Sequence, residues 1–198
     1  INTNRIEIVE KILSDPRMKD AVAGIGVQWW GGGILPEIRK KYPNYKYMQT
    51  ESQCGSGTFD WKAAERTFQL INHYLGNGCE EYTFWNAILC DEGKSTWGWK
   101  QNALIRVDSS KGTATYTPEY YAVKHFSNKV VSGSSVLAFR EQDDDNNLAA
   151  MVFFTPENRY LVVAGNFDDE PRQLTVQLGN KYLDVTLQAH SFNTFTTK

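Results

Sequence analysis

Apolar and polar positions in the first two thirds of the chain follow two alternating periods. Short apolar runs of strand length are each followed by a segment with helical spacing, and this happens three times. Such alternation is typical of parallel βα units. The pattern predicts helix 4–13, strand 24–30, helix 36–41, strand 45–50, helix 60–75, strand 81–89 and helix 117–130.

The clearest helix is 60–75, where Ala64, Phe68, Ile71 and Leu75 share one face. A Gly-Asn-Gly sequence follows and indicates its end. In the last predicted helix, Thr117 has the character of an N-cap residue, and a proline follows at the first helical position.

The pattern changes after about residue 130. Short β-rich runs follow one another, separated by polar turns, which is typical of an antiparallel sandwich. We therefore expect two domains, residues 1–130 and residues 131–198. The predicted strands of the second are 135–139, 148–155, 159–167, 172–178, 182–189 and 192–197.

Three βα units are fewer than a closed parallel barrel requires. An eight-stranded (β/α)8 barrel, or TIM barrel, typically takes about 250 residues. We expect residues 1–130 to be the C-terminal part of such a barrel, with further strands ahead of Ile1.

Charge and composition narrow the classes of function. The chain has 198 residues, 21 basic and 23 acidic, so its net charge is -2. This balance, without a basic stripe, argues against a nucleic-acid partner. No apolar run is long enough to span a membrane. The three cysteines and three histidines lack metal-ligand spacing, so we expect no metal and no cofactor. Asp143–Asp145 is interpreted as a solvated turn.

The ends of the three predicted strands carry unusual residues. They read "QWW", "TE" and "WN", where packing alone favours Val, Ile or Leu. In barrels, chemistry gathers at these ends. Aromatic faces can stack on a sugar ring while amides and carboxylates bind its hydroxyls, so a carbohydrate site is indicated. The candidates are Gln28, Trp29, Trp30, Glu51, Trp85 and Asn86, with Trp97 and Trp99 of a later loop as a wall.

Each candidate also has an ordinary interpretation. A single tryptophan often serves only core packing. Glu51 follows "YKYMQT" and precedes a Ser/Gly-rich loop, so it could be a solvated glutamate at a strand end.

Several motifs in order carry a resemblance to a known family. "SDPRMKDAVAGIGVQWWGG", "YPNYKYMQTESQCG", "EYTFWNAILCDEG", "LIRVD" and "TPEYYAVKHFSNKVVSGS" resemble the C-terminal half of glycoside hydrolase family 30. That family includes glucosylceramidases and β-1,6-glucanases. The resemblance covers nearly the whole chain, including the family's β-sandwich.

The resemblance implies roles for individual residues. The three strands would be barrel strands six, seven and eight, and Glu51 would be the catalytic nucleophile. Trp85 would be the platform for the sugar in the first subsite, and Trp29 and Trp30 the aromatic pair closing strand six. Gln28 stands where the family often has histidine, and Trp30 where it often has tyrosine. These departures affect the shape of the subsite.

The implied mechanism needs a second carboxylate. Family 30 enzymes retain anomeric configuration, which takes a nucleophile and an acid/base. In the family the acid/base follows an asparagine at the end of strand four, and we expect it outside this chain. The chain would then be a proteolytic product, a truncated form, or one part of an enzyme whose second chain supplies strands one to five. The resemblance also implies a secreted or extracytoplasmic location.

Two other functions remain open. A carbohydrate-binding module would place aromatic side chains on the sandwich, yet residues 131–198 contain no tryptophan. A structural fragment that only supports another chain would leave Glu51 unreactive.

Overall fold

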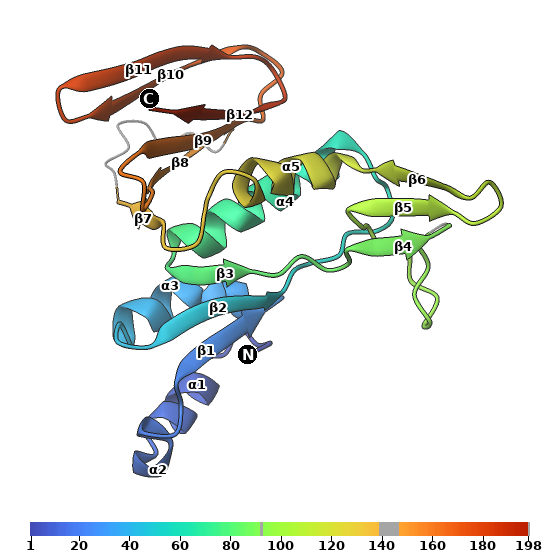
Figure 1. Cartoon of the computed structure of the whole chain (residues 1–198). Helices are drawn as coiled ribbons and strands as arrows, with labels where there is room; N and C mark the ends of the chain where they lie inside the picture. Colours follow the sequence, from blue (N-terminus) through green and yellow to red (C-terminus); the bar gives the residue numbers. More distant parts are fainter. Residues whose placement is uncertain (92, 139–146, 198) are drawn as a thin grey trace. The chain divides into compact units, whose positions relative to one another are not determined.

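The computed structural model describes residues 1–91, 93–138 and 147–197. The Asp143–Asp145 turn lies outside these residues. The chain forms two compact units: residues 1–58 with 73–115, and residues 59–72 with 116–198. Figure 1 follows the elements from α1 to β12.

A three-stranded parallel sheet forms the centre of the first unit. Strands β1 (Gly24–Gln28), β2 (Lys46–Glu51) and β3 (Cys79–Tyr82) lie side by side in that order (Figure 1). Helix α3 (Gly31–Lys41) joins β1 to β2, and helix α4 (Trp61–Gly76) joins β2 to β3. The predicted alternation of strand and helix is confirmed for the first two of its three units. Helices α1 (Ile6–Leu13) and α2 (Pro16–Lys19) precede the sheet.

The side chains of β2 alternate between two environments, as the two-residue period of a strand requires. Tyr47 and Gln49 are buried, whereas Met48 and Thr50 are exposed. The Tyr47 hydroxyl bonds to the carbonyl oxygens of Ile38 and Tyr42, at 3.0 and 2.9 Å. The buried face of β2 is therefore fastened to α3 and its C-terminal end.

The predicted start of the helix at residue 36 is wrong. Helix α3 begins at Gly31, and Pro36 lies inside it. Proline has no N–H to donate to the carbonyl four residues earlier, that of Gly32. The imidazole Nε2 of His73 lies 2.7 Å from that oxygen and takes the missing donor's place.

The predicted strand 81–89 is also wrong. Strand β3 ends at Tyr82, and a separate strand β4 begins at Ile88. At the exit from β3, the N–H of Thr83 donates to the side-chain oxygen of Gln49 at 2.6 Å. Likewise, β1 ends at Gln28, because Trp29 adopts a left-handed backbone with φ 48. The site tryptophans therefore follow the strands rather than ending them.

A small second sheet of the first unit was not predicted. Its strand order is β4 (Ile88–Cys90), β5 (Ile105–Asp108) and β6 (Thr113–Tyr116). Strands β4 and β5 run parallel.

The second unit contains the six predicted β-rich segments, all confirmed as strands. β7 (Ser135–Leu137), β8 (Leu148–Phe154), β9 (Tyr160–Asn166) and β12 (Ser191–Thr196) form an antiparallel sheet in the order β12-β9-β8-β7. β10 (Arg172–Leu178) and β11 (Lys181–Leu187) pair as a hairpin. Helix α5 (Pro118–Ser127) precedes them and has the predicted Thr117 cap.

Two apolar clusters hold this unit together. Ala164 of β9 packs with Leu174 and Leu187 of the hairpin, so the two sheets share a core. In the other cluster, the ring of Phe192 stacks between Trp61 and Phe68, with ring centroids 4.9 Å apart on each side. Across the described residues, no helix combines the length and apolar character needed to cross a membrane.

Candidate functional site

Glu51 is the last residue of β2, and an irregularity in the sheet sets its neighbour. Val27 pairs with Gln49, but the next residue, Gln28, pairs with Glu51. At this β-bulge, Thr50 has no opposite residue on β1 in the pairing register, and Gln28 lies beside Glu51. Bulges often re-aim side chains next to functional sites.

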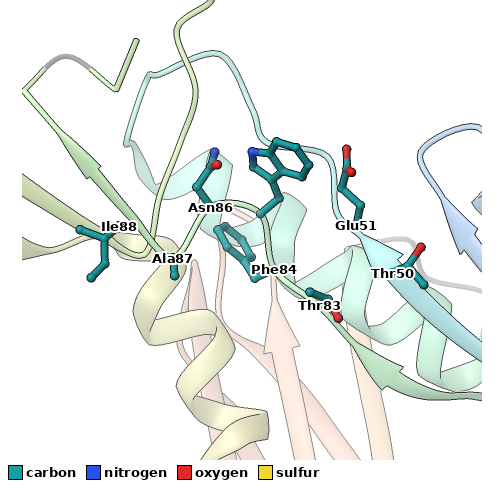
Figure 2. A pocket seen from close by; sticks show the side chains of 8 residues that line it. Thr50, Glu51, Thr83, Phe84, Asn86, Ala87 and Ile88 are labelled. Atoms are coloured by element: carbon teal, nitrogen blue, oxygen red, sulfur yellow. The ribbon is translucent and has the colours of Figure 1, made fainter. Parts of the chain in front are cut away.

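A pocket of about 450 Å³ opens at this end of the sheet. Its lining contains Glu51 from β2 and Trp85 and Asn86 from the segment after β3. Figure 2 shows the side chains of Glu51 and Asn86 projecting to the same side of the strand ends. The remaining lining residues are Thr50, Thr83, Phe84, Ala87 and Ile88. Glu51 is the one carboxylate among these lining residues.

Trp29 contacts Glu51 directly. Its indole Nε1 donates to Oε1 of the carboxylate at 2.5 Å, and Glu51 is partly buried. Hydrogen bonds to a charged acceptor are shorter and stronger than neutral ones. The Glu51 side chain is therefore held in one orientation at the pocket.

Ser52 places the backbone of Trp85. Its buried hydroxyl accepts from the N–H of Trp85 at 2.9 Å, and its own N–H donates to the Thr83 carbonyl at 3.2 Å. The segment after β3 is thus tied to the residue that follows Glu51. The indole Nε1 of Trp85 is buried and has no hydrogen-bond acceptor among the described residues.

Gln101 places Asn86. The side-chain amide of Asn86 donates to Oε1 of the buried Gln101 at 3.2 Å. The N–H of Leu104 donates to the Asn86 carbonyl at 3.1 Å. The Trp85–Asn86 peptide bond is cis. Both the side chain and the backbone of Asn86 are therefore fixed from the segment that follows β4.

Trp85 is the one predicted tryptophan among the lining residues; Trp29 contacts Glu51 but does not line the pocket, and neither do Trp30, Trp97 and Trp99. Trp30 is 71% exposed, and its N–H donates to the side chain of Asn2 at 3.3 Å. Trp97 and Trp99 are exposed on the hairpin closed by Lys94 and Lys100, and their rings lie 5.7 Å apart. Of the predicted residues, Gln28 and Trp29 lie beside Glu51, and Trp85 and Asn86 line the pocket with it.

Ser52, Gln49 and Gln101 were missed by the sequence interpretation. All three are buried polar residues that bond the strand ends to the loops. A polar residue at an inward position of β2 was a signal for Gln49, since its neighbour Tyr47 shares that face. No pattern in the sequence pointed to Gln101.

The two buried cysteines of the first unit are poor nucleophiles. Burial raises the pKa of the Cys54 thiol, and it raises the pKa of Cys79 to about 12. Only the thiolate is reactive. At neutral pH both groups stay protonated, so Glu51 is the better candidate for covalent chemistry.

Comparison with known proteins finds a matching domain model for the C-terminal segment. Residues 133–195 match the model of the glycosyl hydrolase family 30 beta sandwich domain. Over 94% of its length, the chain is 26% identical to lysosomal acid glucosylceramidase of Mus musculus and 23% identical to putative glucosylceramidase 4 of Caenorhabditis elegans. It spans 39% of each of these relatives.

Solved structures support the same fold. SrfJ from Salmonella typhimurium superposes with a TM-score of 0.86 at 20% identity, covering 98% of this chain and 44% of that one. An endo-β1,6-glucanase superposes with a TM-score of 0.80 at 21% identity, covering 94% of this chain and 43% of that one. The resemblance to glycoside hydrolase family 30 is confirmed, with residues 133–195 matching that family's β-sandwich domain.

Proposed function

We propose that the chain is part of a retaining β-glycosidase and that Glu51 is its nucleophile. The observation that carries this proposal is the position of Glu51. Its carboxylate lies at the carboxyl end of a parallel strand and lines a pocket together with Trp85 and Asn86. Catalytic residues of barrel enzymes come from such strand ends.

The other candidate residues have roles that suit a sugar. Trp85 offers a ring face for stacking in the first subsite, and Asn86 and Gln28 offer amides for hydroxyl groups. Trp29 and Trp30 close the end of β1. Trp97 and Trp99 form an exposed aromatic wall on their hairpin, toward more distant parts of the substrate.

The mechanism proceeds through a covalent glycosyl-enzyme. An oxygen of Glu51 attacks the anomeric carbon while an acid protonates the leaving group, and water then hydrolyses the ester. A retaining enzyme holds its two carboxyl groups about 5–5.5 Å apart. Glu51 is the one carboxylate among the pocket residues, and we propose that the acid/base comes from outside this chain.

We further propose that β1, β2 and β3 are strands six to eight of a TIM barrel within residues 1–130, followed by the sandwich at 131–198. Parallel sheets are normally covered on both faces. Met48 and Thr50 leave one face of β2 exposed, which supports additional barrel elements supplied by other residues or by a second chain. The complete barrel is our name for that assembly.

The substrate class is a β-glycoside. Two similar proteins are named as glucosylceramidases and one as an endo-β1,6-glucanase. A glucosyl group is therefore the first sugar to test, carried on either a lipid or a glucan.

A mechanism-based inhibitor tests the proposal directly. A dinitrophenyl 2-deoxy-2-fluoro-β-glucoside should label the complete barrel, and peptide mapping should place the added mass on the peptide with Thr50, Glu51 and Ser52. Glu51→Gln keeps the shape but removes the charge, so it should fold and take up no label. Label on another carboxylate, or near-normal turnover by Glu51→Gln, would contradict the assignment.

The two remaining functions give different results. A structural fragment would show no labelling even when the barrel is complete. If the chain is a binding module, residues 131–198 alone should bind insoluble glucan. A pull-down of that segment with the glucan measures this binding.

A further inference from the structure

The indole of Trp29 makes a contact that a stacking role does not explain. Its Nε1 lies 2.5 Å from Oε1 of Glu51 and joins the first residue after β1 to the last residue of β2. A ring that only offered its face to a sugar would have no need of this donor and acceptor pair.

The backbone holds Trp29 in place for this contact. Its φ of 48 lies in the left-handed region, which is uncommon for residues other than glycine. Such strain persists only where the surroundings fix it. The Trp29 carbonyl accepts from the N–H of Gly32 at 3.1 Å, and the preceding Gln28 is paired with Glu51. The start of α3 and the bulge between β1 and β2 thus fix the backbone from which the indole projects.

Within the described residues, no second hydrogen-bond donor contacts the Glu51 carboxylate. The next tryptophan, Trp30, is 71% exposed. The indole N–H of Trp85, although it belongs to the pocket, has no acceptor there. Trp29 is therefore the indole whose N–H is committed to Glu51.

Resting on the function proposed above, we propose that Trp29 is a positioning residue that stabilises the Glu51 carboxylate as it leaves the covalent intermediate. With Oε1 held by the indole, Oε2 carries the glycosyl group. In the second step, water attacks the anomeric carbon and gives its proton to the acid/base. The bond between that carbon and Oε2 breaks, and its electron pair returns to the carboxylate.

This role predicts an asymmetry between the two steps. The ester of the intermediate is neutral, and negative charge develops on the carboxylate as the ester breaks. A fixed donor is worth most where charge develops in the transition state. In the first step the carboxylate loses charge, so the same N–H gives no such advantage. Removing the N–H should therefore slow breakdown of the intermediate more than its formation.

The test measures both steps on the complete barrel. The dinitrophenyl 2-deoxy-2-fluoro-β-glucoside gives the rate constant of labelling and the inhibitor affinity, and reactivation after its removal gives the rate constant of breakdown. Trp29→Phe keeps an aromatic ring but has no donor. We expect its breakdown to slow by on the order of tenfold to a hundredfold more than its labelling, as for one hydrogen bond to a charged group.

Two further variants of this protein show whether the effect is specific to the indole N–H of Trp29. A benzothiophene analogue of tryptophan at position 29 replaces the N–H by sulfur at nearly the same size, and it decides the matter if Trp29→Phe does not fold. Trp61→Phe is the matched control, because Trp61 stacks on Phe192 in the second unit and is not among the pocket-lining residues. It should leave both rate constants unchanged.

Equal slowing of the two steps, or a loss confined to inhibitor affinity, would overturn this role for Trp29. The same holds if Trp61→Phe reproduces the asymmetry. These outcomes leave Glu51 as the labelled residue and the proposed function intact. Failure of the unaltered protein to be labelled on Glu51 would instead overturn the proposed function.

Discussion

The imidazole of His73 replaces a backbone donor that Pro36 lacks. Nε2 of His73 lies 2.7 Å from the Gly32 carbonyl, which a residue with an N–H at position 36 would otherwise bond. Because a carbonyl oxygen only accepts, Nε2 must carry the proton. Helix α4 therefore completes helix α3, and the proline is tolerated.

Removing this donor should weaken the fold. His73→Leu leaves the Gly32 carbonyl without its partner, and we expect the free energy of unfolding to fall by about 1–3 kcal/mol. His73→Gln retains a side-chain N–H and should recover part of the loss. Urea titration of the purified proteins measures both. An unchanged midpoint in His73→Leu would show that the contact contributes nothing.

Adjacent glycines at the start of α3 should respond in opposite directions to alanine. A Cβ at Gly32 would overlap the Tyr74 ring, whereas a Cβ at Gly33 would meet open space. Gly32→Ala should destabilise by about 1–3 kcal/mol through overpacking. Gly33→Ala should stabilise by about 0.4–1 kcal/mol, because it restricts the unfolded chain. Thermal melts compare the pair, and equal shifts would contradict the packing described.

Ser52 should matter for turnover although it faces no substrate. Ser52→Ala removes the acceptor of the Trp85 N–H and frees the segment that carries Trp85. We expect kcat/KM of the complete barrel to fall by about tenfold, as for the loss of one buried hydrogen bond. Ser56→Ala, in the exposed part of the same loop, is the control. Similar activities for the two variants would remove Ser52 from the site.

Trp85→Ala should reduce turnover far more than Trp61→Ala. Trp85 lines the pocket, and a lost stacking platform should cost about 1–3 kcal/mol of transition-state binding, by analogy with base–aromatic stacking. Trp61 stacks on Phe192, so its loss should appear in the melting temperature instead. Equal losses of kcat/KM in two folded variants would contradict the assignment.

His190 should make the stability of the protein depend on pH. Hydrogen bonds to Glu65, and then to Asp169, raise the pKa of His190 above its ordinary value of 6.5. Because the pKa is raised in the folded state, protonated His190 stabilises the fold. This contribution to the free energy of unfolding is complete below pH 6.5 and is lost as pH rises through the folded pKa.

Replacing His190 by asparagine isolates the pH-dependent contribution of its imidazole. His190 has φ 49, a region that asparagine tolerates better than most residues. His190→Asn should lower the melting temperature at mildly acidic pH, and the difference from the unaltered protein should shrink as pH rises. If the difference in melting temperature grew as pH rises, the pH dependence would have the opposite sign and would contradict the ion pairs of His190.

The sequence determined those elements that depend on local periodicity. Helix α4, all six strands of the second unit and the Thr117 cap are local features, and their residues alone predict them. Polar and aromatic residues at strand ends also identified Glu51, Trp85 and Asn86 as neighbours. Parallel strands bring their carboxyl ends to one edge whatever lies between them.

Only the tertiary structure decided which of these residues touch. The bulge that pairs Gln28 with Glu51, the exit of β3 at Tyr82 and the indole bond of Trp29 depend on contacts between segments distant in sequence. The same holds for Pro36, which lies inside α3 because His73 of another helix supplies the missing donor. Local propensity cannot register a hydrogen bond made by a partner 41 residues away.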